Sequence, residues 1–435
     1  EVVVERMDIK QQVFARLDEI RAPGSIVSSN TSGLSIAGMT EGRSDDFKKH
    51  FLVAHFFNPV RYMRLLELVA GEETLPEVMD FFADFGRFRL GKGVVFGKDT
   101  PNFVGNRIGT FGIMATVAAM MDMDYQIDEV DAITGPAMGH PSSASFGTVD
   151  LVGLDVMAHV VNTVKEGCAG DENRDIFEVP KFMADMVAGG SLGRKTKDKG
   201  GFYKMLKNPD GSKTKLVIDW KTGEYRPSDK PRIPSLGQAR KTHDVGQRLS
   251  GLAFADDRAG AFAWRLLRDT LVYTSNRFGE ISDTIVDIDN ALRWGFNWDL
   301  GPFEVWDALG VQRVVDRMKS EDVAPAQWVL DMLAAGNETF YLESADGRQV
   351  YEPATTSYVK EPKPDTFLVL ADFKRDEARE VFANKGCSIV DVGDGIACVE
   401  FHSALQPAMN PVDGDIIEGL EKGVEIGERD FRGLV

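Results

Sequence analysis

The sequence predicts an α/β fold followed by an all-α part, and three observations lead to this fold class. Strand-like and helix-like segments alternate through the first hundred residues. A nearly continuous apolar stretch over residues 103–123 then indicates a long helix that is buried among other helices. Finally, part of the helical region is repeated later in the chain, which predicts two related helical units.

The alternation in the first hundred residues predicts a mainly parallel sheet, because strand–helix–strand units place neighbouring strands in the same direction. Helical periodicity is clearest over residues 8–20, where Ile9, Val13 and Leu17 fall on one face. A second helix is expected to begin at Pro76 and to stop near Gly86. The expected strands cover residues 2–4, 25–28, 50–57, 65–70 and 94–96.

The internal repeat pairs two loop-and-helix segments. Residues 295–310 resemble residues 139–155, and each copy follows a helix with an aspartate-rich start. The second copy has no counterpart of the segment around Asn106, so we expect it to be structural. The resulting domain prediction places an α/β domain at 1–98, helical domains at 99–205 and 251–335, connectors at 206–250 and 336–384, and a last α/β segment at 385–435. The first connector is expected to contain one short hairpin, over residues 215–220 and 224–226.

Composition excludes several classes of partner. The 435 residues carry a net charge of −18, which disfavours non-specific binding to nucleic acid or anionic membranes. No apolar run approaches the roughly 18 residues of a membrane-spanning helix. Cys168, Cys387 and Cys398 are widely spaced and show neither a disulfide framework nor metal-ligand spacing. We therefore expect no metal site and predict a reducing, cytoplasmic location.

The strongest candidate for chemistry is His55, which is followed twelve residues later by Glu67. The two strand-like segments 51–57 and 65–70 flank a turn that contains Pro59, so they can form a hairpin. A hairpin can bring the imidazole and the carboxylate together. A carboxylate that accepts one ring N–H sets the tautomer and stabilises the imidazolium, as a general base requires. A chance pair at a sheet edge is the alternative reading.

Two further polar groups stand where a sheet of this kind places its sites. Residues 29–32, Ser-Asn-Thr-Ser, follow a strand, and ligands bind at the carboxyl ends of such strands. Such a cluster is more often a turn or a helix cap. Asn106 lies near the start of the long apolar helix. Its amide either bonds to nearby backbone or points back toward the sheet.

With these motifs in order, the sequence resembles the 3-hydroxyacyl-CoA dehydrogenase family. The resemblance covers about 200 residues. It is carried by Ser-Asn-Thr-Ser at 29–32, His-Phe-Phe-Asn-Pro at 55–59, Leu-Glu-Leu at 66–68, Asp-Thr-Pro-Asn-Phe-Val-Gly-Asn-Arg at 99–107, Gly-Arg-Lys-Thr at 193–196 and Gly-Phe-Tyr at 201–203.

The resemblance implies a function for several residues. It implies that His55 is the catalytic base, that Glu67 is its paired acid, and that Ser32 and Asn106 hold the 3-oxygen of the substrate. It also implies NAD as the cofactor and an acyl-CoA as the substrate. Residues near the nicotinamide end of NAD would be Glu5, Lys10, Asn58 and Lys195.

The sequence also departs from the family pattern. The family begins with a Rossmann-like half that contains a strand, a G-x-G-x-x-G turn and an acidic ribose partner, and none of these occurs in this sequence. We therefore expect residues 1–98 to be the second half of a Rossmann-like domain. Asn102 stands where the family has glycine, which should alter the loop before Asn106.

The end of the chain resembles the opening of an enoyl-CoA hydratase (crotonase) domain. A strand over residues 392–402 precedes an asparagine turn at 408–412, a helix at 415–426 and a strand start at 431–435. This order implies a bifunctional protein in which a dehydrogenase precedes a hydratase.

The expected reaction is the NAD-dependent interconversion of a (3S)-hydroxyacyl-CoA and a 3-ketoacyl-CoA in fatty-acid β-oxidation. Two alternatives stay open: a related sugar-acid dehydrogenase, and an inactive dehydrogenase-like scaffold module. The incomplete nucleotide half leads us to expect that this chain is inactive by itself. The sequence does not decide the acyl length or whether the protein forms a homo-oligomer.

Overall fold

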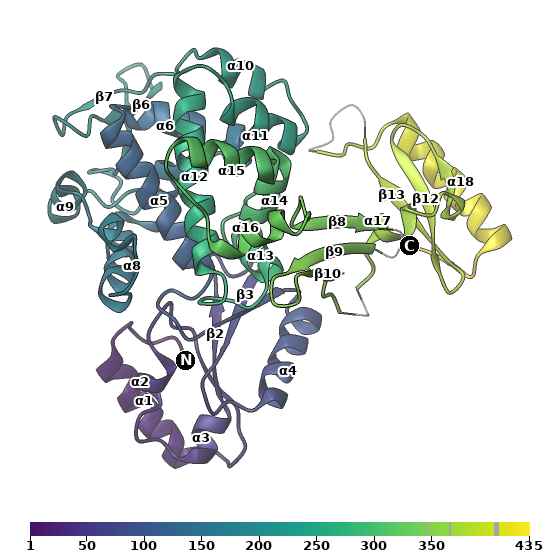
Figure 1. The fold of residues 1–435 in the computed structure, drawn as a ribbon, viewed down its shortest axis with the longest axis horizontal. Helices are drawn as coiled ribbons and strands as arrows, with labels where there is room; N and C mark the ends of the chain where they lie inside the picture. The colour runs from purple at the N-terminus through teal and green to yellow at the C-terminus, as the bar shows by residue number, and fades with distance from the viewer. Residues whose placement is uncertain (345–346, 365–366, 404–408) are drawn as a thin grey trace. The chain divides into compact units, whose positions relative to one another are not determined.

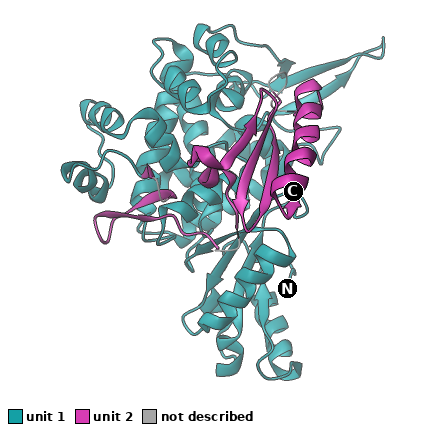
Figure 2. Ribbon diagram, turned by 90° about the vertical axis from the view of Figure 1, so that its right-hand side faces the viewer, with its two compact units in different colours: residues 1–340 teal, residues 341–435 magenta. Residues whose placement is uncertain are grey.

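The computed structural model describes residues 1–344, 347–364, 367–403 and 409–435 (Figure 1). The chain divides into two compact units, Glu1–Phe340 and Tyr341–Val435 (Figure 2).

The first unit opens with a four-stranded sheet in the order β1-β2-β3-β4. The pairs β1–β2 and β3–β4 are parallel, but β2 and β3 form an antiparallel hairpin. The sheet is therefore mixed, and the expectation of a mainly parallel sheet is only partly met. The strands are β1 (Val27–Ser29), β2 (Phe51–Phe56), β3 (Leu65–Ala70) and β4 (Gly93–Gly97).

The strand predicted at residues 2–4 is wrong. These valines form no strand and are exposed, with 83% of Val2 accessible. In this segment Glu1 reaches the sheet edge, where its carbonyl accepts the N–H of Asn30. The Glu1 ammonium also donates to the carbonyl of Ser28 in β1, but residues 2–4 form no ladder with that strand. β-branched residues favour a strand only where a neighbouring strand pairs with them.

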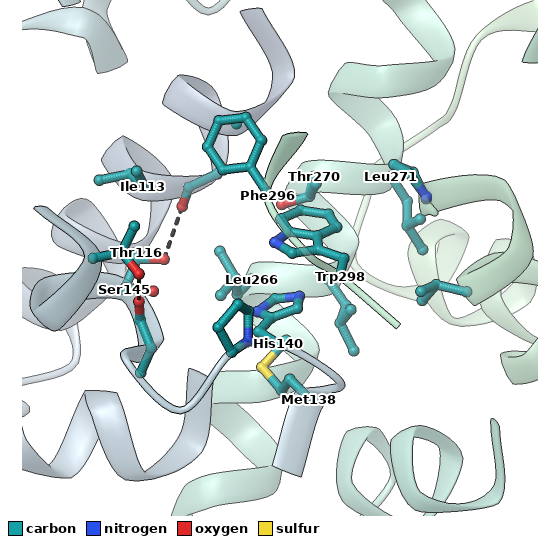
Figure 3. A pocket seen from close by; sticks show the side chains of 18 residues that line it. Ile113, Thr116, Met138, His140, Ser145, Leu266, Thr270, Leu271, Phe296 and Trp298 are labelled. Carbon is teal, nitrogen blue, oxygen red and sulfur yellow. Dashed lines mark hydrogen bonds between the residues drawn. The ribbon is translucent and has the colours of Figure 1, made fainter. Parts of the chain in front are cut away.

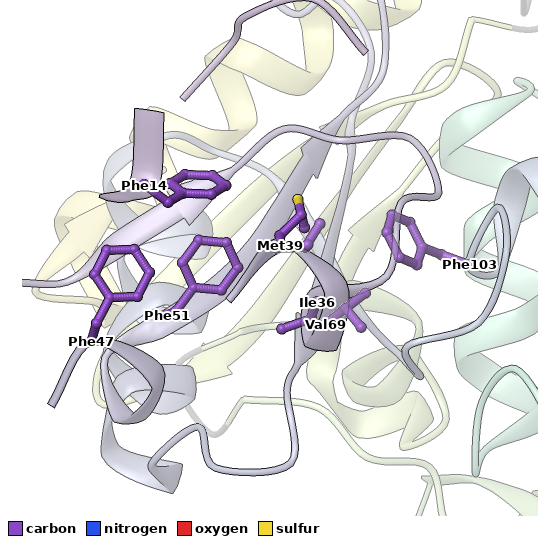
Figure 4. Packing of buried hydrophobic residues seen from close by; sticks show 8 residues of the cluster. Phe14, Ile36, Met39, Phe47, Phe51, Val69 and Phe103 are labelled. Atoms are coloured by element: carbon purple, nitrogen blue, oxygen red, sulfur yellow. The ribbon is translucent and has the colours of Figure 1, made fainter. Parts of the chain in front are cut away.

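Helices cover both faces of the sheet because side chains alternate along its strands. On one face, Phe51 packs with Phe14 and Phe47 from α1 (Met7–Ile20) and α3 (Asp45–Lys49), as Figure 4 shows. The adjacent Leu52 points to the other face and packs against α4 (Pro76–Asp84). The short helix α2 (Ile36–Met39) completes the first face, and a π-helical turn (Phe85–Arg89) continues α4.

The first helical unit begins with the predicted long buried helix, α5 (Gly105–Asp122). It continues through α6 (Ile127–Thr134), a 3-10 turn (Pro136–Met138), α7 (Ala144–Val152), α8 (Leu154–Gly167), a 3-10 turn (Arg174–Phe177) and α9 (Lys181–Ala188). In the described residues no single helix has the length and apolarity to cross a membrane, although the bent pair α7–α8 passes that test jointly.

The second helical unit repeats this arrangement. Its helices are α12 (Arg258–Arg277), α13 (Ile285–Gly295), α14 (Pro302–Leu309), α15 (Val311–Ser320) and α16 (Gln327–Ala334).

Equivalent aspartates perform the same task in both helical units. Asp131 of α6 accepts the backbone N–H groups of Phe146 and Gly147 at the start of α7. Asp289 of α13 accepts those of Phe303 and Glu304 at the start of α14. A carboxylate at a helix N-terminus satisfies donors that the helix itself cannot pair. The repeated aspartates of the sequence are thus structural caps.

The segments predicted as connectors contain more secondary structure than the single hairpin expected at 215–220 and 224–226, and that hairpin is confirmed. Residues 203–227 form a three-stranded antiparallel sheet of β5 (Tyr203–Lys207), β6 (Lys213–Ile218) and β7 (Tyr225–Pro227), followed by α10 (Pro234–Ala239) and α11 (Val245–Ala253). A sheet of the same order, β8 (Tyr341–Ser344), β9 (Gly347–Glu352) and β10 (Ser357–Lys360), opens the second compact unit. The duplication therefore extends beyond residues 251–335.

The second compact unit continues with α17 (Leu370–Lys374), a 3-10 turn (Glu377–Arg379) and a four-stranded sheet in the order β11-β12-β13-β14. The strands are β11 (Glu380–Ala383), β12 (Cys387–Gly393), β13 (Ile396–Phe401) and β14 (Gly433–Leu434). The helix α18 (Gly414–Asp430) connects β13 to β14, which run parallel. In the predicted asparagine turn, Ala408 lies outside the described residues.

Candidate active site

His55 and Glu67 occupy directly opposite positions on the antiparallel pair β2–β3. Opposite residues of such a pair share one face of the sheet. The Nδ1 atom of His55 lies 2.6 Å from Oε2 of Glu67. Both side chains are buried, with 4% of His55 and 0% of Glu67 exposed. Since the carboxylate accepts the Nδ1 proton, Nε2 is left to meet a substrate. The predicted contact within the hairpin is confirmed.

The second oxygen of Glu67 binds the start of α5. Oε1 accepts the backbone N–H groups of Val104 and Gly105, at 3.2 and 2.7 Å. Helix α5 has no side-chain cap of its own at Val104. Free N–H groups at a helix N-terminus, together with the helix dipole, stabilise a negative charge. Glu67 is therefore held between the imidazole and the helix end.

Aromatic rings enclose the imidazole. The ring centroids of Phe57 and Phe103 lie 4.8 and 5.7 Å from that of His55. A Cβ atom at Gly105 would lie 3.0 Å from the Phe57 ring and 3.4 Å from Glu67 Oε1. Sequence analysis did not identify Phe57, Phe103 or Gly105 as parts of the site, although they lie inside the motifs at 55–59 and 99–107.

The loop after β1 carries Ser32 to the same edge of the sheet. Asn30 Oδ1 accepts the N–H of Phe56, at 2.8 Å, which ties the loop to the end of β2. Glu5 Oε1 accepts the hydroxyl of Thr31 at 2.5 Å and the N–H of Ser32 at 2.9 Å. The Ser32 hydroxyl has no hydrogen-bond partner among the described residues. It is therefore available to a ligand.

Asn102 shapes the entry to α5. Its φ of 64° lies in the left-handed region, which asparagine tolerates better than most residues. The buried side chain donates from Nδ2 to the carbonyl of Val160 in α8, at 3.0 Å. Asn102 also packs on Gly33, where a Cβ atom would lie 2.7 Å from the Asn102 backbone nitrogen. Asn102 thus forms the turn and bonds the loop to the first helical unit.

Asn106 is the second residue of α5 and is half-buried. It directly follows Gly105, whose N–H donates to Glu67. No hydrogen bond involves its side-chain amide within the described parts of the chain. The amide is therefore not a local backbone cap. Asn106 lies next in sequence to Gly105, the residue that binds Glu67.

The four residues assigned to the nicotinamide end are not all brought together. Lys10 is buried, with its ammonium 3.1 Å from Glu1 Oε2 and 3.2 Å from Glu5 Oε2. Asn58 is exposed just beyond β2. Lys195 pairs instead with Asp155 in the first turn of α8, and no described contact joins it to the other three.

A buried acidic group lies beneath this part of the site. Burial by itself would raise the pKa of the Glu1 carboxyl, but hydrogen bonds from Ser29, Val3 and Lys10 hold that pKa below its ordinary value. Lys10 therefore lies between two carboxylates, Glu1 and Glu5. The Lys10 ammonium pairs with the Glu5 carboxylate. That carboxylate also accepts the N–H of Ser32 and so fixes the loop that carries this residue.

Two polar side chains of the site can meet a bound ligand. The Ser32 hydroxyl and the Asn106 amide have no described partner, and both stand at the carboxyl-terminal edge of the sheet. The glycine-rich turn that would hold a pyrophosphate does not occur in the sequence. In the described residues, no three His, Cys, Asp or Glu side chains gather as metal ligands.

Comparison with protein families matches two consecutive segments of the chain. Residues 1–100 match "3-hydroxyacyl-CoA dehydrogenase, NAD binding domain". Residues 103–205 match "3-hydroxyacyl-CoA dehydrogenase, C-terminal domain". The boundary between them falls at the entry to α5, where Glu67 meets the helix.

Curated relatives carry related names. A "Probable 3-hydroxyacyl-CoA dehydrogenase" of Bacillus subtilis is 44% identical over all of this chain, which covers 53% of that protein. A "Putative fatty acid oxidation complex trifunctional enzyme" of Rickettsia felis is 31% identical over 70% of this chain and 41% of its own length. The chain thus spans about half the length of the first of these relatives.

A solved structure, the 3-hydroxybutyryl-CoA dehydrogenase of Escherichia coli, shares the fold. It is 21% identical and superimposes with a TM-score of 0.57, covering 77% of this chain and 81% of its own. At this identity the likeness concerns architecture alone.

Proposed function

We propose, from the premise that the chain belongs to the 3-hydroxyacyl-CoA dehydrogenase family through residues 1–205, that it interconverts a (3S)-hydroxyacyl-CoA and a 3-ketoacyl-CoA. The observation that carries the proposal is the 2.6 Å contact of His55 Nδ1 with Glu67 Oε2, whose other oxygen binds the start of α5. This arrangement presents Nε2 of a buried imidazole as a base.

His55 would take the proton of the substrate's 3-hydroxyl on Nε2 as the C3–O bond becomes a carbonyl. NAD, when bound, accepts the hydride that leaves C3. Glu67 would stabilise the imidazolium that forms, because its carboxylate already accepts the Nδ1 proton. The surrounding Phe57 and Phe103 would exclude water from the imidazole.

Ser32 and Asn106 would hold the 3-oxygen. Each offers a hydrogen-bonding group without a described partner, and they come from the two elements that flank the His55–Glu67 pair. Donors aimed at an oxygen where charge develops lower the barrier most effectively when they are fixed in advance. Backbone contacts with Glu5 and with Glu67 provide this fixation.

On the cofactor side, Glu5, Asn58 and Lys195 would meet the nicotinamide end. Lys10 would act through Glu5, because it is buried and paired with two carboxylates. Lys195 can take part only after it exchanges its contact with Asp155.

We further propose that the parent protein also carries an enoyl-CoA hydratase and works in fatty-acid β-oxidation. The support is the order β12, β13, α18, β14 in residues 387–434 and the printed name of the Rickettsia felis relative. A cytoplasmic location and a homo-oligomer stay predictions.

The test replaces His55 by glutamine in the full-length protein. NADH formation from a 3-hydroxyacyl-CoA should fall by roughly 10²–10⁴-fold, the range for a lost general base. The exposed His159 on α8, changed to glutamine, is the matched control and should leave the rate unchanged. Near-normal NADH formation by the His55 variant would remove this residue from the mechanism.

Further measurements test the cofactor site and distinguish the enzyme from the two alternatives. Calorimetry on the 435 residues alone should show weak or no NAD binding, since their sequence lacks the glycine-rich turn. A full-length protein that oxidises no 3-hydroxyacyl-CoA would favour the scaffold module. Oxidation of a sugar acid in preference to an acyl-CoA would favour the other dehydrogenase.

A further inference from the structure

An apolar cavity lies beside α5, between the two helical units (Figure 3). Its volume is about 60 Å³, whereas one water molecule needs only about 10–15 Å³. Ile113 and Thr116 of α5 form one wall. Leu266, Phe296 and Trp298 close it from the second helical unit.

Three glycines of α5 show why the cavity lies where it does. They fall on one face of the helix at positions 105, 109 and 112. A Cβ atom at Gly105 would lie 3.0 Å from the Phe57 ring, and one at Gly109 would lie 2.1 Å from the Phe296 ring. A Cβ atom at Gly112 would meet nothing within 4 Å. Aromatic rings thus fill the first two places, and the third is open.

The cavity adjoins the candidate active site. Phe57 lies between the two: its ring centroid is 4.8 Å from that of His55 and 6.1 Å from that of Phe296. Phe296 itself lines the cavity. From Gly109 to Thr116 the helix rises by roughly 10 Å, at about 1.5 Å per residue. The cavity therefore leads away from the reacting centre along α5.

Most polar side chains in the wall are already bonded within the protein. The Thr116 hydroxyl donates to the carbonyl of Gly112, at 2.8 Å, and the Ser145 hydroxyl donates to Thr134 Oγ1, at 3.0 Å. His140 donates from Nδ1 to the carbonyl of Thr134 and stacks on Trp298 with centroids 4.3 Å apart. Burial lowers the pKa of His140 to about 4, so this ring is uncharged at neutral pH.

We propose that this cavity holds the acyl tail of the substrate, and that Gly112 sets the length of tail the enzyme accepts. The inference rests on the proposed dehydrogenase function. A partly open cavity lined mainly by apolar groups favours apolar ligands over water. An alkyl chain that extends from C3, beside His55, would pass the Phe57 ring and lie against Gly112. The second helical unit, which has no catalytic residue in the proposed reaction, would then complete the substrate site through Phe296 and Trp298.

The test replaces Gly112 by leucine in the full-length protein. The side chain would enter open space, so the fold should be kept, and the glycine-to-leucine change favours the helix. We expect kcat/KM for 3-hydroxydecanoyl-CoA to fall about 10-fold or more, as contacts of a few methylene groups are lost. The value for 3-hydroxybutyryl-CoA should change less than about twofold, because a short tail does not reach the cavity.

The matched control is Gly251→Leu, at an exposed glycine of α11 whose Cβ position is also open. Gly112→Ala gives a graded variant with the same direction of change, should the leucine variant fail to fold. A second readout is binding of the unreactive butyryl-CoA and decanoyl-CoA by calorimetry, where the variant should weaken only the longer ligand.

Equal losses for both chain lengths, or no loss for either, would overturn the assignment of the cavity while leaving the dehydrogenase intact. Failure of the unaltered protein to oxidise either substrate would instead count against the proposed function.

Discussion

At the scale of single residues, Glu67 belongs both to the candidate catalytic pair and to the contact between the sheet and α5. Its two oxygens serve different partners, the imidazole of His55 and the N–H groups that begin α5. This double use explains why a carboxylate can be fully buried in a sheet: every strong interaction it needs is supplied by a neighbour. It also couples the position of α5, and hence of Asn106, to the orientation of His55.

Glu67→Gln should lower turnover less than His55→Gln does, because the base remains but its imidazolium loses the counter-charge. The variant should also unfold more easily, by about 1–3 kcal/mol, since an amide offers one acceptor where two were used. Steady-state rates and urea unfolding measure the two effects. Leu68→Met, a volume-conserving change on the same strand, is the control. A fully active and equally stable variant would contradict both assigned tasks.

At the scale of elements, buried polar groups hold the two helical units together. Arg107 of α5 donates to Tyr273 of α12 and to Asp171, each at 2.6 Å. Tyr273 also donates to Asp171, at 2.8 Å, and Arg277 lies 3.3 Å from the same carboxylate. Buried charges persist only when they are paired in this way. The network fixes α12 against α5 and so helps to position the wall that carries Phe296.

The aspartate cap of α7 should make stability depend on pH. Burial raises the pKa of Asp131 from 3.8 to about 7, although Phe146, Tyr203 and Gly147 donate to it and oppose the rise. The folded protein therefore holds this proton to higher pH than the unfolded chain. Between about pH 4 and pH 7 the folded state binds more protons, so the contribution of Asp131 to the free energy of unfolding falls as pH rises.

Asp131→Asn removes this titration. The free energy of unfolding of the unaltered protein, minus that of the variant, should decrease from pH 4 to pH 7 in denaturant titrations. Asp185→Asn, on the exposed face of α9, should give a difference that does not change in this way. A flat difference for Asp131 would show that its carboxyl titrates as in the unfolded chain, and a difference that grows with pH would show that folding lowers its pKa.

At the scale of the whole molecule, sequence reasoning succeeded where a local pattern determines the structure. The hairpin that pairs His55 with Glu67 was predictable, because two apolar runs flank a short turn with a proline. The apolar stretch that became α5 was predictable for a similar reason. Of the three-stranded sheets after each helical unit, only the hairpin at 215–220 and 224–226 was predicted, and the pair β6–β7 confirms it. The strands β5 and β6 are rich in lysine and partly exposed, so they lack the alternation that marks a buried strand along their length.

The aromatic enclosure of His55 and the cavity beyond it were also not predictable. Both depend on contacts between segments far apart in the chain, such as Gly109 with Phe296. In the sequence these glycines are ordinary members of an apolar helix. Their role is to let side chains of the second helical unit pack closely against α5, and this contact depends on the tertiary fold.

The division of the chain into two compact units leads to a last prediction. Phe340, the final residue of the first unit, is fully buried among Phe303, Trp306 and Trp328, and its N–H donates to Asp307. Asp150 accepts the N–H of Phe202 in the same way in the first helical unit, so this contact closes each copy of the repeat. The second compact unit has a core of its own, centred on Ile389, Ala397 and Ile426.

Phe340→Ala should therefore destabilise the first unit alone. Loss of a buried phenylalanine costs about 3–5 kcal/mol, which should move only the calorimetric transition of residues 1–340 to lower temperature. Phe401→Ala, at a half-exposed site in the second unit, should leave that transition in place. If Phe340→Ala shifted every transition together, residues 1–340 and 341–435 would unfold as one cooperative unit, which would contradict the prediction.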